Sequence, residues 1–561
     1  MGTLFTLLYP LSRAVTALIL AFTSIFSGGW LAGAFRTPAP SLAPPAWPRW
    51  VHEHWVWENE GTQESVLRMV GDYRALGIPV GAVIIDRPWS TGVNDFVPDP
   101  ERYPDLAEYV ETFHGMDVRV MLWATSVVNE DSPNFQEAKD KGYFLSGGKT
   151  VKWWAGKGAF IDYDNPEAVA WWHGQMDKVL DMGIDGWKVD AADIYAITLL
   201  PAWNKKGLVG WSKYKGQSYG DFFHYTREKL GNDRVISARP ANDMLDIGLP
   251  LQFTARDINF AGWVGDQDHS WEGLRMALDS LFLASLHNHV SSGSDIGGFR
   301  SGKTGEQNPP KDVFLRWAQM GAFCPVMENG GGGEHRPWMF DAETAAVYKK
   351  FALLHHALIP YIYSQAAYSY ELRQPTMRPR FGKYEYLLGE DIFAAPLYEE
   401  GNSRRVIFPE GEWIYMFDES KVYTGIQTLS FPLDAFPAFI RKGAIIPMEG
   451  AGEDFTTVRV YPTTGTKQFG LYEEGKTGAM LSYTKRESFL GIQSEATDRA
   501  LLFRVYGEAR PAIVDLGNST MAKAASLEAL KGMASGYFYD AEGILWIMVR
   551  DASAGVSISI C

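Results

Sequence analysis

The chain has 561 residues, of which 46% are hydrophobic, so it can bury a large core and is too long for one ordinary domain. Its formal net charge is −15 and it contains no basic run, which argues against nucleic acid as a partner, because phosphate binding depends on basic surface. Cys324 and Cys561 are the only cysteines, so the sequence also argues against a structural disulfide framework.

The N-terminus carries the one targeting signal that we find. Residues 14–35 contain no charge, are long enough for a spanning helix and follow Arg13, while Ala32-Gly-Ala34 resembles a cleavage site for a signal peptidase. We therefore expect the secretory route, with the protein either secreted after cleavage or anchored in a membrane. The Pro-rich run from Thr37 to Pro48 predicts an extended linker, so residues 1–50 form a leading segment.

From about Val51 the pattern alternates between strands and helices, which predicts an α/β fold, a (β/α)8 TIM barrel over residues 51–373. Helices are expected at Pro166–Met182 and Trp271–Ser285. One strand is expected near Trp50–Trp57, and the other seven at Val80–Asp86, Val118–Trp123, Ile184–Asp190, Val235–Arg239, Ile258–Val264, Val290–Asp295 and Phe323–Met327.

After about Gln374 the sequence consists of short strand-like runs separated by Gly and Pro, as in Phe439–Pro447. This texture predicts C-terminal β-sandwich modules. We expect a proximal module over residues 374–449 and a distal β-rich domain over residues 450–561.

Two strand ends carry the residues that indicate a reaction. The stretch from Gly183 to Asp193 predicts a buried strand with Lys188, Asp190 and Asp193 at its carboxyl end, and Asp266 ends a second predicted strand. Cleavage of a glycosidic bond needs one carboxylate below the sugar ring and one carboxylic acid at the leaving oxygen. Asp190 suits the first role, with Lys188 favouring its charged form, and Asp266 suits the second beside Trp263. The alternative is that each Asp is a helix cap or part of a loop ion pair.

Further side chains are candidates for contact with a sugar. Asp86 ends the predicted strand Val80–Asp86 and could accept hydrogen bonds from sugar hydroxyls or cap a helix. Trp123, Trp153 and Trp187 could stack on a sugar or fill the barrel core.

Two other motifs do not support a site. Gly297–Thr304 satisfies the phosphate-loop pattern, but Gln307-Asn-Pro-Pro310 follows at once where a helix would have to begin. His287 and His289 lack a third partner at the spacing of metal ligands, so we expect core or pocket histidines.

These residues bring the chain close to a known family. From about Val51 to Met448 the sequence resembles glycoside hydrolase family 31, the retaining α-glycosidases. Trp187-Lys-Val-Asp190 resembles the nucleophile strand of the family, Trp263-Val-Gly-Asp-Gln267 its acid/base segment and Gly293-Ser-Asp-Ile-Gly-Gly-Phe299 its late barrel strand. Further matches are Asp162–Pro166, Trp171-Trp172, Arg316-Trp317 and Leu387–Pro396. The resemblance implies that Lys188, Arg239, Trp263, Asp295 and His335 also contact the substrate.

The chain departs from the family at four points. Only about fifty residues precede the barrel where members usually carry an N-terminal β-sandwich, so we expect one wall of the site to be absent or supplied otherwise. Asp193 replaces a glutamate of the family. The Arg-x-His that is common after the eighth strand is replaced by Met327-Glu-Asn, and His335 would act from a shifted position. Either Arg239 or Arg256 could be the arginine before the acid/base, and we prefer Arg239.

The sequence thus predicts a retaining α-glycosidase that needs no cofactor and no metal. Among substrates, α-glucosides are favoured, followed by α-galactosides, and sulfoquinovosides remain open. The alternatives are a barrel that binds glycans without cleaving them and a metal-dependent hydrolase, which the missing ligand cluster disfavours.

Overall fold

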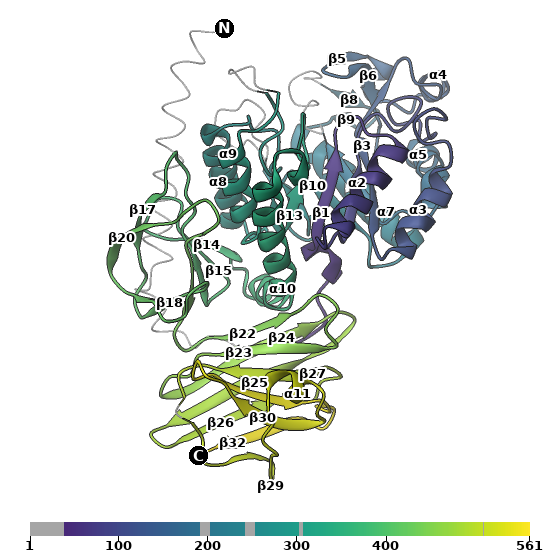
Figure 1. The fold of residues 1–561 in the computed structure, drawn as a ribbon. Coiled ribbons are helices and arrows are strands. Elements are labelled where there is room, and N and C mark those ends of the chain that lie inside the picture. Colours follow the sequence, from purple (N-terminus) through teal and green to yellow (C-terminus); the bar gives the residue numbers. More distant parts are fainter. Residues whose placement is uncertain (1–38, 191–201, 242–252, 302–306, 509) are drawn as a thin grey trace. The chain divides into compact units, whose positions relative to one another are not determined.

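A computed structural model describes residues 39–190, 202–241, 253–301, 307–508 and 510–561 (Figure 1). The predicted signal peptide or anchor at residues 14–35 lies outside these ranges, and so does Asp193. The described chain divides into two compact units: Glu53–Lys349, and residues 39–52 together with Lys350–Cys561. No helix in the described ranges is long and apolar enough to cross a membrane.

The first unit is a parallel barrel, and the predicted fold is confirmed. Within the described residues it has eight parallel strands: β1 (His54–Glu58), β2 (Ala82–Ile85), β3 (Arg119–Thr125), β7 (Gly186–Asp190), β10 (Val235–Ala238), β11 (Gly262–Trp263), β12 (Ser292–Gly293) and β13 (Met327–Asn329). Six of them pair in the order β10-β7-β3-β2-β1-β13 and the other two pair as β11-β12. β10 lies beside β11, and a bridge between Asp295 and Glu328 joins the end of β12 to β13, which closes the ring.

Each predicted strand overlaps an observed one, although the eighth begins later than expected. We expected it at Phe323–Met327, and it runs over Met327–Asn329. Phe323 and Cys324 instead form a turn after the preceding helix, where their amides donate hydrogen bonds to the carbonyls of Met320 and Gly321. The apolar run Phe323–Val326 therefore belongs to a buried turn, which hydrophobicity alone does not distinguish from a strand.

Helices surround the strands, as a parallel barrel requires. They are α2 (Gln63–Ala75), α3 (Leu106–Gly115), α5 (Pro166–Leu180), α7 (Trp211–Leu230), α8 (Trp271–Leu286), α9 (Lys311–Gly321) and α10 (Ala342–Leu372), which continues into the second unit. Local sequence fixes the two predicted helix starts. The side chain of Asn165 accepts a hydrogen bond from the amide of Glu167 ahead of Pro166, and that of Ser270 accepts one from the amide of Gly273. Both predicted helices are confirmed.

Excursions from the barrel carry further small elements at the end that holds the carboxyl ends of the strands. A three-stranded sheet follows β3 in the sequence and consists of β4 (Val127–Asn129), β6 (Gly156–Phe160) and β5 (Val151–Trp153). A helix α4 (Phe135–Asp140) and a short hairpin of β8 (Trp203–Asn204) and β9 (Gly207–Leu208) complete this region.

The second unit is rich in antiparallel sheets, as expected. Its proximal part has a sheet of β14 (Met377–Pro379), β15 (Tyr386–Leu388), β16 (Ile392–Ala394), β21 (Ala438–Arg441), β18 (Trp413–Tyr415) and β19 (Val422–Tyr423), with β17 (Ser403–Ile407) paired to β20 (Ile426–Ser430). A cluster around Phe393, Trp413 and Phe439 fills its core. The distal part has a five-stranded sheet of β22 (Ile445–Glu449), β23 (Phe455–Val460), β27 (Ala500–Val505), β31 (Leu545–Val549) and β30 (Ser535–Tyr539). Its second sheet has six strands, β24 (Gly465–Glu473), β25 (Lys476–Arg486), β26 (Phe489–Ser494), β32 (Val556–Ile560), β28 (Val514–Leu516) and β29 (Ser519–Thr520).

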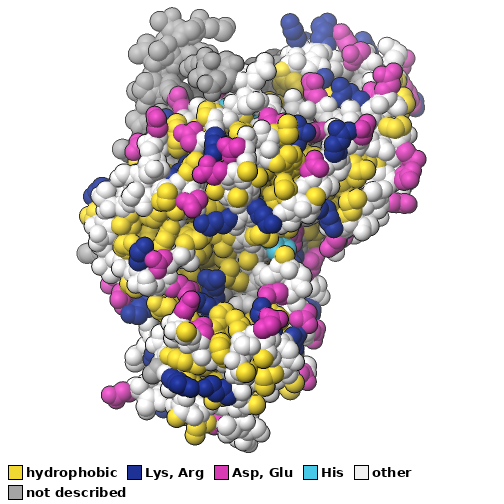
Figure 2. Space-filling model, viewed as in Figure 1, with side chains coloured by type: hydrophobic (Ala, Val, Ile, Leu, Met, Phe, Trp, Pro, Cys, Tyr) yellow, Lys and Arg dark blue, Asp and Glu magenta, His cyan; other side chains and the backbone are white. Residues whose placement is uncertain are grey.

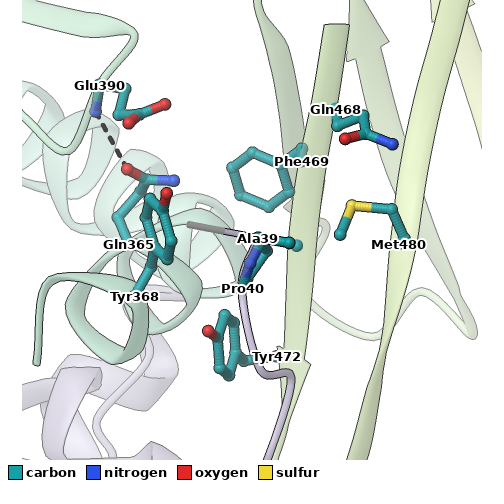
Figure 3. A pocket seen from close by; sticks show the side chains of 10 residues that line it. Ala39, Pro40, Gln365, Tyr368, Glu390, Gln468, Phe469, Tyr472 and Met480 are labelled. Atoms are coloured by element: carbon teal, nitrogen blue, oxygen red, sulfur yellow. Dashed lines mark hydrogen bonds between the residues drawn. The ribbon is translucent and has the colours of Figure 1, made fainter. Parts of the chain in front are cut away.

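The described part of the Pro-rich run, which we expected to be an extended linker, packs against other parts of the second unit. Ala39 and Pro40 lie between Tyr368 on α10 and Phe469 on β24, where they line a cavity of about 530 Å³ (Figure 3). Farther along, the Trp47 indole is buried and donates a hydrogen bond to Nε2 of His52, at 3.0 Å. Apolar side chains within the run therefore bind it to the second unit.

Acidic and basic side chains are interspersed on the face shown in Figure 2, among scattered hydrophobic ones. On this face the described residues form no continuous basic surface, in line with the negative net charge.

Candidate active site

Two aspartates meet on one arginine at the carboxyl end of the barrel. Nε of Arg239, which follows β10, lies 3.4 Å from Oδ1 of Asp190 at the end of β7. Nη2 of the same arginine is hydrogen-bonded to Oδ2 of Asp266, and Nη1 donates to the carbonyl of Gly265 at 3.0 Å. The structure thus places Arg239 between the two predicted catalytic carboxylates. Arg256 instead pairs with its neighbour Asp257, Nε to Oδ1, at 3.1 Å.

Strand alternation explains why these side chains face the barrel interior. In the parallel register of β3 and β7, Trp123 is paired with Lys188 and Thr125 with Asp190, so these four side chains point to one face. Trp187 directly precedes Lys188 on β7 and points to the other face. Its indole donates a hydrogen bond of 2.8 Å to Oγ1 of Thr226 on α7, and its ring is completely buried. Of the two roles that we left open for Trp187, its position favours filling the core, because the ring lies in the layer between β7 and α7.

Lys188 forms its ion pair with Asp86, whereas we had considered only the effect of its charge on Asp190. Its Nζ lies 2.8 Å from Oδ2 of Asp86, which follows β2, and 3.6 Å from the centre of the Trp57 ring. Burial lowers the pKa of Lys188, but the surrounding carboxyl groups of Asp86, Asp295 and Glu328 raise it above its ordinary value. Lys188 is therefore a permanent cation in the interior, and Asp86 is its partner and not a helix cap.

Asp295 lies beside the predicted acid/base and is completely buried. Its Oδ2 accepts a hydrogen bond from the backbone amide of Asp266 at 2.9 Å, and its Oδ1 accepts one from Nε1 of Trp263 at 2.7 Å. Burial and the neighbouring Asp266 raise the pKa of Asp295 to about 6, against the opposing effect of Lys188. Both oxygens thus bind protein groups, and the contact of Asp295 with a sugar stays a prediction.

Glu328 is a site residue that sequence reasoning missed. It lies on β13 between two residues that face the surrounding helices. Met327 packs beside Gly321 of α9, and Asn329 donates a hydrogen bond to Tyr73 of α2. Because successive side chains on a strand point to opposite faces, Glu328 points into the barrel. It is buried, and the Trp57 side chain on β1 offers it a hydrogen bond that lowers its pKa. Burial and the negative charge of Asp295 raise the pKa of Glu328 to about 8, against the effect of Lys188. The sequence feature that could have identified Glu328 is a single acidic residue directly after the apolar run Ala322–Met327.

The remaining predicted tryptophans lie near the opening. Trp153 is buried and donates a hydrogen bond to Oδ1 of Asn129, at 2.8 Å. Trp123 faces the interior, and the edge of Trp154 meets it with ring centres 6.0 Å apart. Trp154, which we did not single out, is 61% exposed and has the Arg87 guanidinium 5.5 Å from its ring centre. Trp123 and Trp154 together offer aromatic surface beside the carboxylates.

His335 holds the glycine-rich loop that follows β13. One of its ring nitrogens, Nε2, lies 2.8 Å from the carbonyl oxygen of Gly298. Burial lowers the pKa of His335 to about 4, so the imidazole is neutral near pH 7 and donates this hydrogen bond. The ring also lines a cavity of about 140 Å³ together with Trp57 and Tyr73. Its contact with a sugar stays a prediction.

Within the described ranges, no group of three or more His, Cys, Asp or Glu side chains could hold a metal ion. His287 stacks on Phe253 with ring centres 3.2 Å apart, and burial lowers the pKa of His289 to about 4. The accidental phosphate-loop pattern runs into residues 302–306, which lie outside the described residues.

Comparison with known proteins gives consistent matches. A model for the glycosyl hydrolases family 31 TIM-barrel domain matches residues 44–365, and a model for the family 31 C-terminal domain matches residues 366–446. The α-xylosidase XylQ of Lactiplantibacillus pentosus is 27% identical over 72% of this chain and 54% of its own length. Alpha-glucosidase 2 of Bacillus thermoamyloliquefaciens is 26% identical over 79% of this chain and 59% of its own length. The chain therefore spans little more than half of these relatives.

The fold has matches among solved structures as well. A family 31 dextranase of Flavobacterium johnsoniae, solved in complex with glucose, superposes with a TM-score of 0.83 over 92% of this chain and 71% of that one, at 19% identity. At this identity the likeness concerns the fold alone.

Proposed function

Because the chain belongs to glycoside hydrolase family 31, we propose that it hydrolyses terminal α-linked sugars with retention of configuration at the anomeric carbon. The observation that carries this proposal is the pair of carboxylates, Asp190 and Asp266, which project from two strand ends and contact one guanidinium group. Two carboxyl groups flanking the scissile bond are the common requirement of glycosidases.

In the first step, an oxygen of Asp190 attacks the anomeric carbon while Asp266 gives its proton to the leaving oxygen. The glycosidic bond breaks, and the sugar becomes an ester of Asp190. In the second step, Asp266 takes a proton from water, the resulting nucleophile attacks the anomeric carbon, and Asp190 leaves as a carboxylate. Arg239 contacts both carboxylates and keeps them in place, and its guanidinium rests over the Trp263 ring with 3.9 Å to the ring centre.

The glycone pocket would be formed by the interior groups around the nucleophile. The ion pair of Lys188 and Asp86 offers a charged donor and acceptor for sugar hydroxyls, and the ring of Trp123 faces the same interior. We favour α-glucosides, because relatives named as α-glucosidase and α-xylosidase act on sugars with the same ring configuration at the carbons that they share. α-Galactosides are the next candidates, and a sulfoquinovosidase of Escherichia coli, 25% identical over 71% of the chain, keeps sulfoquinovosides among the compounds to test.

A panel of 4-nitrophenyl α-glycosides with glucose, galactose, xylose and sulfoquinovose tests the proposal. We expect cleavage of at least one compound, and NMR should detect the α-anomer of the released sugar first. Release of the β-anomer first would show inversion and contradict the mechanism. A protein that binds these sugars and cleaves none would be a glycan-binding barrel, in which the same carboxylates accept hydroxyl protons.

A further inference from the structure

The predicted acid/base sits in a strained backbone conformation. Asp266 has a φ of 73°, in the left-handed region that favours glycine. For another residue this conformation costs about 1 kcal/mol or more, and it persists only where neighbouring groups enforce it. The groups that enforce it therefore also decide where the Asp266 carboxyl group points.

Asp295 provides this constraint through two hydrogen bonds to one chain segment. Its carboxylate accepts from the amide of Asp266 and from the indole of Trp263, at 2.9 and 2.7 Å. Gly265 lies between these two residues, and a Cβ on it would come within 2.0 Å of the Trp263 indole nitrogen and 2.3 Å of Oδ2 of Asp295. Only glycine at this position lets the carboxylate approach the backbone so closely.

We propose that Asp295 is a positioning residue that holds the general acid/base Asp266 through its backbone amide. This inference rests on the proposed glycosidase function, and in it the role of Asp295 is to bind groups of the protein around the site. The same carboxylate fixes the Trp263 ring, over which the Arg239 guanidinium lies, and Arg239 in turn contacts both Asp190 and Asp266. One buried group thus determines the orientation of the acid and of the arginine that it shares with the nucleophile.

The charge of Asp295 depends on the groups that face it. These are Lys188 from β7, Asp266 from the segment after β11 and Glu328 from β13. Burial raises the pKa of Asp295 to about 6, so above that pH both oxygens accept, and below it one becomes a hydroxyl. Asparagine has a single acceptor oxygen at this position and can therefore hold only one of the two donors.

The test uses two substrates with the same sugar and different leaving groups. A nitrophenolate departs without protonation, whereas a sugar alcohol needs the general acid. In Asp295→Asn we expect kcat on the disaccharide to fall about 100-fold and kcat on the nitrophenyl glycoside to fall less than about tenfold, with KM little changed. Equal losses on both substrates would overturn the proposal, because a group that merely supports the fold affects both alike.

A second variant approaches the same contact from the other side. Gly265→Ala keeps every charge and forces the Asp295 carboxylate away from the segment, so it should show the same dependence on the leaving group. It also decides the question if Asp295→Asn does not fold. Asp185→Asn is the matched control: Asp185 is buried at the opposite end of β7 and accepts a hydrogen bond from the amide of Val120. It should lower the melting temperature and slow both substrates by the same factor.

The outcomes separate this inference from the proposed function. If the unmutated protein cleaves no compound of the panel, the proposed function fails, and the crystal structure of Asp295→Asn then tests the constraint alone. Asp266 should leave the left-handed region in that variant. An Asp266 that keeps its φ and its contact with Arg239 would overturn the proposal, whatever the activity.

Discussion

Glu328 should make the protein less stable as the pH rises, and replacing it should remove that loss. Its pKa is raised from 4.5 to about 8 in the folded protein by burial and by Asp295, against the effect of Lys188. Below about pH 4.5 both the folded and the unfolded chain hold the proton. Between about pH 4.5 and 8 only the folded chain holds it, so the free energy of unfolding falls across this window.

The magnitude follows from the difference between the two pKa values. It corresponds to about 5 kcal/mol over the whole window and about 3 kcal/mol at pH 7, at roughly 1.4 kcal/mol per pKa unit. Glu328→Gln has nearly the same shape and cannot ionise. We therefore expect the variant to gain stability over the unmutated protein as the pH rises from 4.5 to 8, and to gain nothing further above that range.

Thermal and urea unfolding at pH 5 and pH 8, followed by tryptophan fluorescence, measure this gain. At about 2 °C per kcal/mol for a domain of this size, the melting temperatures should diverge by about 5–10 °C between the two pH values. Glu334→Gln is a control of opposite sign: burial raises the pKa of Glu334, but its bonds to Arg336 lower it more. That variant should lose stability above pH 4.5 and lose less at pH 3. If Glu328→Gln is equally stable at pH 5 and 8 relative to the unmutated protein, Glu328 is ionised in the fold and the reasoning is wrong.

Four further predictions concern the site. Asp190→Asn should reduce kcat by about three orders of magnitude or more with an unchanged circular dichroism spectrum, and retained activity would exclude it as the nucleophile. Asp266→Ala should lose about 10²–10⁴-fold on a disaccharide but far less on a nitrophenyl glycoside, and azide should restore part of the latter rate; equal losses without azide rescue would remove Asp266 from the acid/base role. A crystal structure should place the two carboxyl groups about 5–6 Å apart, whereas about 9 Å would indicate an inverting enzyme. Lys188→Met should lower the free energy of unfolding, measured in urea, by about 3–5 kcal/mol, because Asp86 loses its buried cation. The additional change Asp86→Asn should recover part of this loss. A Lys188→Met variant as stable as the unmutated protein would contradict the ion pair.

The sequence alone determined the features that depend on local pattern. Short apolar strands alternating with helices predicted the barrel, because strands buried on both faces are apolar throughout. The two predicted helices begin directly after their caps, Asn165 and Ser270. Aspartates at the ends of two such strands predicted the carboxylate pair, because parallel strands bring their carboxyl ends to one edge. The Gly- and Pro-rich strands after residue 374 likewise predicted the β-rich second unit.

Only the tertiary structure decided which side chains meet. Lys188 is two residues from Asp190, yet its cation pairs with Asp86, because the barrel brings β2 and β7 to the two sides of β3. Trp187 lies in the most informative motif and still faces away from the site, since a strand turns successive side chains to opposite faces. The pKa of Glu328 is raised because the residue is buried and because the negative charge of Asp295 lies close to it. Both conditions arise only when the ring of strands closes and brings these two residues together.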